Sequence, residues 1–134
     1  MGLSDGDREF VAGNRSAVMV TLKADGTPHV ARVGVGLVEG KLWSSGTQDR
    51  VRTKHLRRDP RSTLFVFDDK HAYRWLGLET TVTILDGPDA AELNLRLYRT
   101  LAGEPDDVDE YLRAMVNERR LIYEFEVGRT YGMT

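Results

Sequence analysis

Two runs of apolar and β-branched residues, joined by an Asp-Gly turn, constrain the fold of this chain more than any other feature. The runs are Ser16–Lys23 and His29–Val38, and the turn between them contains Asp25-Gly26. Asp-Gly is typical of tight hairpins because glycine adopts a positive φ without steric cost. Glu39-Gly40 predicts a second tight turn, which leads into a strand over Lys41–Ser45. Antiparallel strands are therefore expected to fill the first part of the chain.

The rest of the sequence predicts further strands and several helices. The expected strands cover residues 61–67, 73–85 and 121–127, the last continuing to Tyr131. The expected helices cover residues 4–13, 48–59, 88–102 and 105–118. The first helix should begin at a cap formed by Ser4 or Asp5, and its apolar contacts should be Phe10 and Val11.

This order of elements favours a small barrel or sandwich with helices packed on its outside. A doubly wound sheet would need strands that alternate with helices, and the sequence lacks that pattern. The length of 134 residues predicts one domain over 1–134. No apolar run approaches the roughly 18 residues of a membrane span, and the polar beginning is unlike a signal peptide. We therefore expect a cytoplasmic protein without a membrane partner.

The residues offer no self-sufficient catalytic group. The sequence has no cysteine, which excludes disulfide scaffolds, thiolate metal sites and cysteine nucleophiles. Its histidines, His29, His55 and His71, are far apart in the sequence, so no metal site is predicted. No serine lies in a Gly-x-Ser-x-Gly turn, and no carboxylate pair is placed recognisably for acid–base chemistry. The catalytic residues are thus unknown, and an enzyme of this sequence would need a bound cofactor to supply the reactive group.

The segment Arg50–Arg61 has six cationic side chains and one carboxylate, on a chain whose net charge is −2. Arg50 and Arg52 lie at or near the first turn of the expected helix, where the helix dipole makes cations unfavourable. A bound anion at the helix start would explain both, because it would accept from N–H groups and guanidinium groups together. The preceding residues add hydroxyl groups typical of phosphate-binding loops, namely Ser44, Ser45 and Thr47.

Two other interpretations of the basic segment stay open. It could be a solvated face in which Arg57, Arg58 and Arg61 pair with carboxylates from elsewhere in the fold, such as those at 104–110. It could also bind nucleic acid, but a single basic helix on an acidic chain gives only a few phosphate contacts. Nucleic acid is therefore not expected as a partner.

Aromatic residues on the expected strands could pack in the core or contact a flat ligand. Tyr73 and Trp75 are two residues apart on one strand, so they should face the same side. A ring whose phosphate reached the basic helix could lie against such a face. His29 and Arg32, on the second apolar run, could donate hydrogen bonds to the edge of that ring.

With these residues the chain resembles the flavin and deazaflavin split-barrel family typified by pyridoxamine 5′-phosphate oxidase, in its branch of small proteins that bind coenzyme F420. The similar segments are Thr21–Val33, Lys41–Arg61, Tyr73–Glu79 and Leu97–Gly132, and LRRDPR at 56–61 is the most specific motif. The resemblance implies a mainly β (α+β) fold, a six-stranded antiparallel split β-barrel of the FMN-binding type with short flanking helices. It also implies a homodimer with the cofactor in a groove at the interface.

The resemblance implies that Arg52, where relatives often have lysine, binds the cofactor phosphate, and that Arg50 contacts the phosphate or an acidic tail. His55 stands where many relatives have asparagine. Lys54, with Arg57 and Arg58, could extend a basic track along the helix. The remaining implied contacts are to the phosphate, the ring edge or the groove, from Ser44, Ser45, Thr47, His29, Arg32, Tyr73 and Trp75.

F420 carries a lactyl-phosphate and an oligoglutamate tail, so it is more anionic than FMN and fits a basic track better. The resemblance therefore implies an F420H2-dependent reductase that transfers a hydride to a small electron-poor conjugated molecule, such as an activated ene or a quinone-like acceptor. Two alternatives with the same fold stay open. One is an FMN-binding oxidase or reductase, and the other is a non-catalytic F420-binding or carrier protein.

Overall fold

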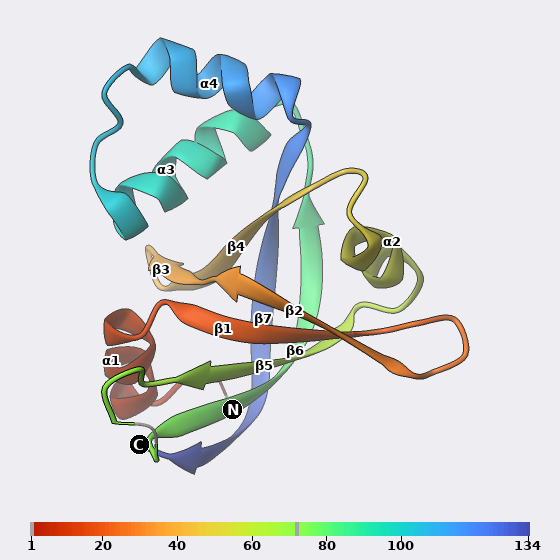
Figure 1. Ribbon diagram of the computed structural model, residues 1–134, viewed down its shortest axis with the longest axis vertical. Coiled ribbons are helices and arrows are strands. Elements are labelled where there is room, and N and C mark those ends of the chain that lie inside the picture. Colours follow the sequence, from red (N-terminus) through yellow and green to blue (C-terminus); the bar gives the residue numbers. More distant parts are fainter. Residues whose placement is uncertain (1, 72) are drawn as a thin grey trace.

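The strands of this protein form one antiparallel sheet that curls around the hydrophobic core (Figure 1). The computed structural model describes residues 2–71 and 73–134. The strands are β1 (Ser16–Leu22), β2 (Pro28–Gly34), β3 (Gly36–Val38), β4 (Lys41–Thr47), β5 (Arg61–Phe67), β6 (Trp75–Leu85) and β7 (Arg120–Met133). The helices are α1 (Asp5–Gly13), α2 (Val51–Arg58), α3 (Ala90–Ala102) and α4 (Val108–Asn117). The strand order is β2-β1-β5-β6-β7-β4-β3, which confirms the expected mainly β fold with flanking helices.

The Asp-Gly turn forms the predicted hairpin. Strands β1 and β2 pair in register from Ser16 opposite Gly34 to Leu22 opposite Pro28. Gly26 has a φ of 87°, and the Asp25 carboxylate accepts hydrogen bonds from the backbone N–H and the hydroxyl of Thr27. The turn is therefore closed by its own residues, as its sequence predicted.

The strand expected over His29–Val38 is broken in two, so the sheet has seven strands and not the six that were expected. The break lies at Val35, whose side chain is buried and whose N–H donates to the Arg15 carbonyl at 2.8 Å. A Cβ atom on Gly36 would come within 3.1 Å of the Leu97 and Leu101 side chains of α3. Glycine at this position lets the helix pack closely against the point where the chain changes partner from β1 to β4.

Strand β7 joins the two halves of the sheet. It pairs with β4 over Arg120–Phe125 and with β6 over Ile122–Met133, with a register shift opposite Leu78/Thr80. This long strand runs through the middle of the molecule in Figure 1. The main core lies inside the curled sheet and includes the fully buried Leu64, Leu78, Leu121 and Tyr123.

Helix α1 begins at a reciprocal cap. Ser4 Oγ accepts from the Asp7 N–H at 3.0 Å, and the Asp7 carboxylate accepts from the Ser4 N–H at 3.2 Å. Phe10 and Val11 are its buried residues. The prediction of Ser4 as the cap and of these two apolar contacts is confirmed.

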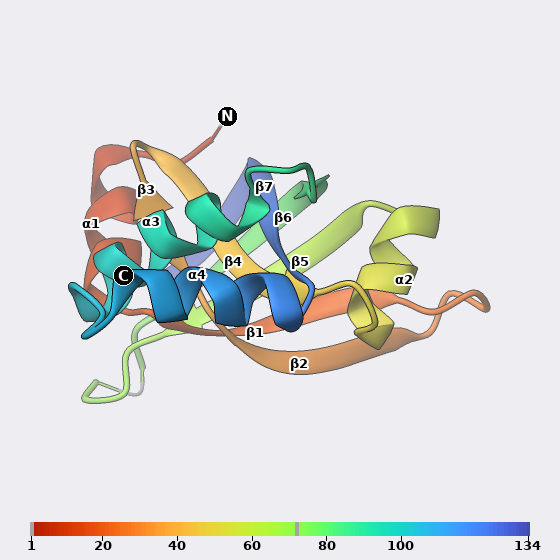
Figure 2. The same ribbon diagram turned by 90° about the horizontal axis from the view of Figure 1, so that it is seen from above.

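Helices α3 and α4 pack side by side beyond one end of the barrel (Figures 1 and 2). Their contact includes Tyr98 and Tyr111, whose ring centroids are 4.9 Å apart. A smaller buried cluster joins α3 to the sheet through Trp43, Leu97 and Ile122. Among the described residues, no helix is long and apolar enough to cross a membrane.

Helix α2 and strand β6 begin later than expected, and both differences affect the candidate site. Helix α2 begins at Val51 rather than near residue 48, because Gln48 is held outside it by a hydrogen bond from its N–H to the Arg119 carbonyl at 3.0 Å. Strand β6 begins at Trp75, so Tyr73 lies in the turn before the strand rather than on it. Asp68 N–H donates to the Arg74 carbonyl at 3.1 Å and closes that turn.

Candidate functional site

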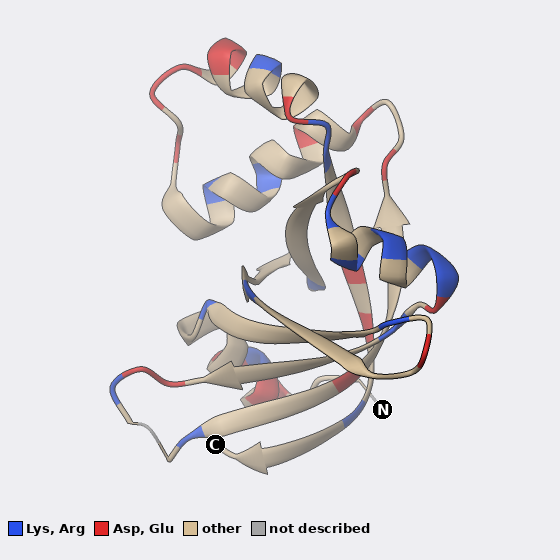
Figure 3. Cartoon of the chain, turned by 45° about the vertical axis from the view of Figure 1, so that its right-hand side comes forward, with Lys and Arg blue, Asp and Glu red and all other residues tan. Residues whose placement is uncertain are grey.

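A hollow of about 730 Å³ lies at the start of helix α2. Its walls come from the end of β4, the first residues of α2, His29 of β2, and the turn between α4 and β7. Figure 3 shows basic residues along α2 and at the beginning of β7. Four guanidinium groups line the hollow against two carboxylates, with the arginines being Arg50, Arg52, Arg119 and Arg120. The hollow therefore has the charge to hold an anion.

The first turn of α2 has no side-chain cap among the described residues. Its N-cap residue is Arg50, with an extended backbone, and no acidic residue lies in the first turn. Asp49 lies nearby, but its carboxylate accepts a hydrogen bond from the Thr47 hydroxyl at 2.6 Å, which lowers the pKa of Asp49. A helix start normally needs an acceptor for its free N–H groups, so this end is suited to an external anion.

Arg52 gives the most direct evidence that the hollow binds a ligand, because one of its nitrogens needs a hydrogen-bond acceptor. Its Nε atom is buried and has no hydrogen-bond partner within the described part of the chain. Its guanidinium lies over the Tyr123 ring, 5.7 Å from the centroid, and burial lowers the pKa of Arg52. A buried donor without an acceptor is costly, by about 1–3 kcal/mol. An acceptor brought against this nitrogen would satisfy the donor, and Arg52 lines the hollow.

Tyr123 packs against the Arg52 guanidinium, and neighbouring residues hold the Tyr123 side chain in place. The Thr53 hydroxyl donates to the Thr47 carbonyl at 2.7 Å, so the Tyr123 hydroxyl is the donor in its short hydrogen bond to Thr53 Oγ1. A Cβ atom on Gly46 would collide with the Tyr123 ring. The absence of a side chain at Gly46 thus leaves room for the Tyr123 ring, which the Arg52 guanidinium contacts. Sequence reasoning missed Gly46 and Tyr123, because their contact joins positions far apart in the chain.

His29 contributes a second buried nitrogen to the same hollow. Its Nδ1 atom has no hydrogen-bond partner in the part of the chain that the structure describes. The His29 ring lies 5.2 Å from the His55 ring in an edge-to-face arrangement. His55 is buried, its Nδ1 is 2.9 Å from the Thr21 hydroxyl, and burial lowers its pKa. His29 and His55 are far apart in the sequence, and β2 and α2 bring their rings together.

The structure divides the basic segment into paired and unpaired side chains. Arg57 donates to Asp86 at 2.9 Å, Arg58 to the Leu22 carbonyl at 2.5 Å, and Arg61 to Asp59 at 2.9 Å. For Arg50 and Lys54, the described residues contain no ion pair. The interpretation of the segment as a protein-paired basic face therefore describes its second half, although the acceptors are Asp86, Asp59 and a carbonyl and not the carboxylates at 104–110. The anion interpretation fits the first half.

The predicted hydroxyl loop does not form as a unit. Ser44 donates to the Gly34 carbonyl at 2.7 Å, and Ser45 donates to Asn94 of α3 at 2.5 Å. Both residues belong to β4, which continues to Thr47, and neither lines the hollow. Thr47 does line it, but its hydroxyl hydrogen is donated to Asp49. The reason is that these residues continue the strand, where side chains alternate between faces.

The structure places three other predicted contacts away from the hollow. Arg32 is exposed on β2 and its guanidinium is 3.4 Å from the Ser16 hydroxyl. Tyr73 is 65% exposed in the turn before β6. Trp75 stacks on Phe65 at 5.6 Å and meets Tyr131 edge-to-face at 6.1 Å. Trp75 and its aromatic neighbours lie on the outer face of the sheet, and neither Trp75 nor Tyr73 lines the hollow.

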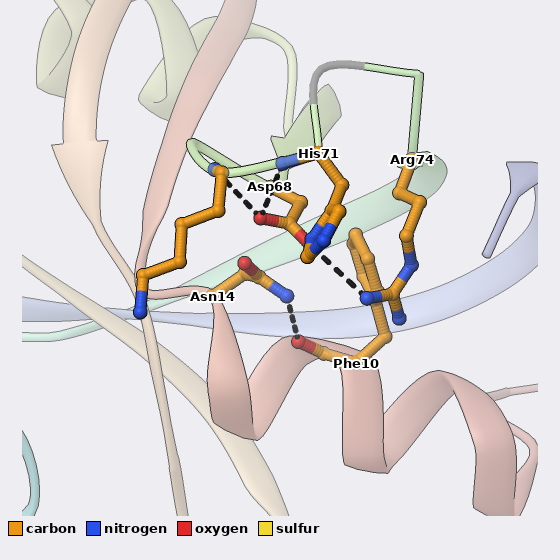
Figure 4. Close-up of polar contacts among 6 residues, drawn as sticks. Phe10, Asn14, Asp68, His71 and Arg74 are labelled. Carbon is orange, nitrogen blue, oxygen red and sulfur yellow. Dashed lines mark hydrogen bonds and ion pairs between the residues drawn. The ribbon is translucent and has the colours of Figure 1, made fainter.

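A second hollow, of about 610 Å³, lies beside the turn that follows β5 (Figure 4). Its centre is the Asp68 carboxylate, which accepts from the Lys70 and His71 N–H groups and from Arg74 at 3.0 Å. Arg74 also covers the Phe10 ring at 5.1 Å. These contacts show that Asp68 stabilises the turn that follows β5. Among residues 2–71 and 73–134 no cluster of three or more His, Asp or Glu side chains suits a metal ion.

Comparisons with known proteins match nearly the whole chain. A family model described as pyridoxamine 5′-phosphate oxidase matches residues 3–133. An F420H2-dependent biliverdin reductase of Mycobacterium tuberculosis is 27% identical over 136 residues, which is 97% of this chain and 88% of that protein. Two solved structures share the fold. A conserved hypothetical protein of Mycobacterium tuberculosis has a TM-score of 0.79 at 22% identity, covering 96% of this chain and 82% of the other. An F420 reductase has a TM-score of 0.76 at 19% identity, covering 96% and 98%.

Proposed function

This chain belongs to the pyridoxamine 5′-phosphate oxidase family, and on that premise we propose that it is an F420H2-dependent reductase. The unpartnered Nε of Arg52 at the uncapped start of α2 is the observation that carries the proposal. The curated relative named as an F420H2-dependent enzyme supports the choice of cofactor, because it aligns over 97% of this chain. The single domain over 1–134 then contains one subunit's share of the cofactor site.

The residues of the hollow fit the phosphate end of such a cofactor. Arg52 Nε and His29 Nδ1 are buried polar atoms that need a partner, and the α2 start offers backbone N–H groups beside them. Arg50 adds an exposed cation at the same helix end. Lys54, on the exposed surface of α2, adds longer-range attraction. Together these groups hold and orient an anion, which fixes the rest of the bound molecule relative to the protein.

When bound, reduced F420 supplies the hydride that an electron-poor conjugated acceptor receives. The protein's share is orientation, charge neutralisation and exclusion of water. Biliverdin, which the curated relative is named for, is the first acceptor to test. Activated enes and quinone-like molecules follow as the broader acceptor class.

We also propose that the protein is a homodimer whose second copy covers the outer face of the sheet. That face exposes large apolar side chains, including Phe65 at 39%, Tyr131 at 44% and Met133 at 59%. An apolar face of this kind is typical of a protein interface. In the dimer, Arg32, Tyr73 and Trp75 would line a groove at the interface, whereas His29 faces the other side of β2. Sedimentation is expected to show a dimer, and a 15.1 kDa species with full cofactor affinity would contradict this arrangement.

Two alternatives of the same fold make different predictions. An FMN-binding oxidase or reductase needs only one phosphate site and would bind FMN more tightly than F420. A non-catalytic carrier would bind F420 without turnover on any acceptor of the panel. Nucleic acid is disfavoured because Arg57, Arg58 and Arg61 already have protein acceptors, which leaves few cations for a phosphate backbone.

A titration with F420 and with FMN in the same buffer tests the proposal. Cofactor fluorescence is expected to report tighter binding of F420. Arg52→Ala should weaken F420 binding at least tenfold, or about 1.4 kcal/mol, through loss of a charge-assisted hydrogen bond. Arg113→Ala is the matched control, because Arg113 is exposed on α4 and does not line the hollow. Equal affinities of Arg52→Ala and the wild type would remove Arg52 from the site, and preference for FMN would favour the flavin alternative.

A further inference from the structure

Arg119, in the turn between α4 and β7, has a backbone conformation that arginine rarely adopts. Its φ is +56°, and Glu39 is the other non-glycine residue with positive φ among those described. A helix that ends in this way usually has glycine or asparagine at the position, because a Cβ atom is strained there. Glycine would relieve the strain, so the presence of arginine points to a use for its side chain.

The backbone of Arg119 ties the two walls of the hollow together. Its carbonyl accepts from the Gln48 N–H at 3.0 Å, and its own N–H donates to the Val116 carbonyl at 3.0 Å. These bonds place the Arg119 side chain at the hollow, next to the residues that precede α2. Glycine could make both backbone bonds equally well, so they do not explain the guanidinium.

The charge of Arg119 is available to a ligand. Its side chain is exposed, and no carboxylate within the described ranges forms an ion pair with it. The neighbouring Arg120 is different, because its Nε donates to the Glu118 carboxylate at 2.9 Å. Two carboxylates line the hollow with Arg119: Glu118 accepts from Arg120, and the pKa of Asp49 is lowered chiefly by the Thr47 hydroxyl, with smaller contributions from Arg119 and Arg50. Arg119 thus influences Asp49 only weakly.

Apart from Arg52 and from Lys54, which lies on α2 outside the hollow, the unpaired cations near the α2 start belong to other parts of the chain. Arg57 and Arg58, which would continue a basic track along the helix, already donate to Asp86 and to the Leu22 carbonyl. Beyond Arg50 and Arg52, the next unpaired arginine at the hollow is Arg119, on a different element. A ligand with one phosphate would use the α2 start and leave Arg119 without a role.

We propose that Arg119 binds a second anionic group of the same ligand, a carboxylate attached beyond the phosphate that Arg52 and the α2 start receive. This inference rests on the proposed function and deepens it. It identifies the ligand class as a phosphate ester extended by carboxylates, and it assigns the extension to the α4–β7 turn. Arg119 is thereby a specificity-determining residue, because it strengthens the binding of F420 but not of a cofactor that ends at its phosphate.

The test compares two ligands on the 134-residue chain. One is F420, and the other is the deazaflavin 5′-phosphate, which has the same ring and phosphate but no lactate or glutamate. Arg119→Gly should weaken F420 binding at least fivefold and change binding of the deazaflavin 5′-phosphate less than twofold. Because glycine suits the positive φ, Arg119→Gly should melt at or above the wild-type temperature.

Glu39→Gly is the matched control, because Glu39 has a φ of +51° and does not line the hollow. It should relieve backbone strain in the same way and leave both affinities unchanged. An F420 affinity of Arg119→Gly equal to that of the wild type would overturn the inference. An equal loss for both ligands would also overturn it, since Arg119 would then act on the phosphate or on the fold. Failure of the wild type to bind F420 at all would instead refute the proposed function itself.

Discussion

Replacing Arg52 by methionine should raise the stability of the cofactor-free protein and weaken its binding of the cofactor. Arg52 Nε is buried without an acceptor among the described residues, and such a group costs about 1–3 kcal/mol. Methionine keeps an unbranched side chain for packing and removes the unpaired donor. The contact of the guanidinium with the Tyr123 ring is lost, at about 0.5–1 kcal/mol. The expected net gain is about 1 kcal/mol, which raises Tm by about 3–4 °C at this chain length.

Thermal melts with and without F420 measure both halves of this prediction. With F420 at about 100 times the wild-type Kd, the wild type should gain about 2.7 kcal/mol, and a variant that binds tenfold more weakly should gain about 1.4 kcal/mol. Arg50→Met is the control, because Arg50 is exposed and has no buried unpaired atom. It should weaken binding without raising Tm. An Arg52→Met variant that melts several degrees below the wild type would refute the reasoning, since Arg52 would then be a structural residue.

Two further predictions concern the surroundings of Arg52. Gly46→Ala should destabilise the protein by about 1–3 kcal/mol and weaken F420 binding, because the new Cβ would collide with the Tyr123 ring. A thermal melt measures the stability and a titration measures the F420 affinity. An unchanged melting temperature and an unchanged affinity would contradict this packing. Burial lowers the pKa of His55 below 6.5, so the unfolded chain takes up a proton that the folded chain does not, and stability should decrease as the pH falls below about 6.5. Denaturant unfolding at pH 5 and 7.5 should show a smaller decrease for His55→Asn than for the wild type, and an equal decrease would exclude His55 as the cause.

Local signals in the sequence predicted much of the fold. The Asp25-Gly26 hairpin and the Ser4 cap are made by residues within a few positions of one another, so their geometry follows from local chemistry. The break at Val35 was missed, because it depends on the packing of α3 against Gly36. Alternation along the chain shows a strand but does not show where the strand changes its partner.

The candidate site was only partly predictable for the same reason. The placement of Arg50 and Arg52 at a helix start is a local feature, and the structure brings both to one hollow. That hollow is completed by Arg119 and supported by Tyr123, which approach from the far end of the sequence through pairing of β4 with β7. No short-range pattern marks such partners. Likewise, Arg57 of α2 pairs with Asp86, which follows β6, and this removes a cation that the sequence alone leaves available.

A crystal structure of the protein with bound F420 tests the central claim most directly. The account predicts the phosphate at the start of α2, within hydrogen-bond distance of Arg52 Nε and beside His29. A helix start left empty, or filled by a carboxylate of the protein's own chain while F420 binds elsewhere, would contradict it.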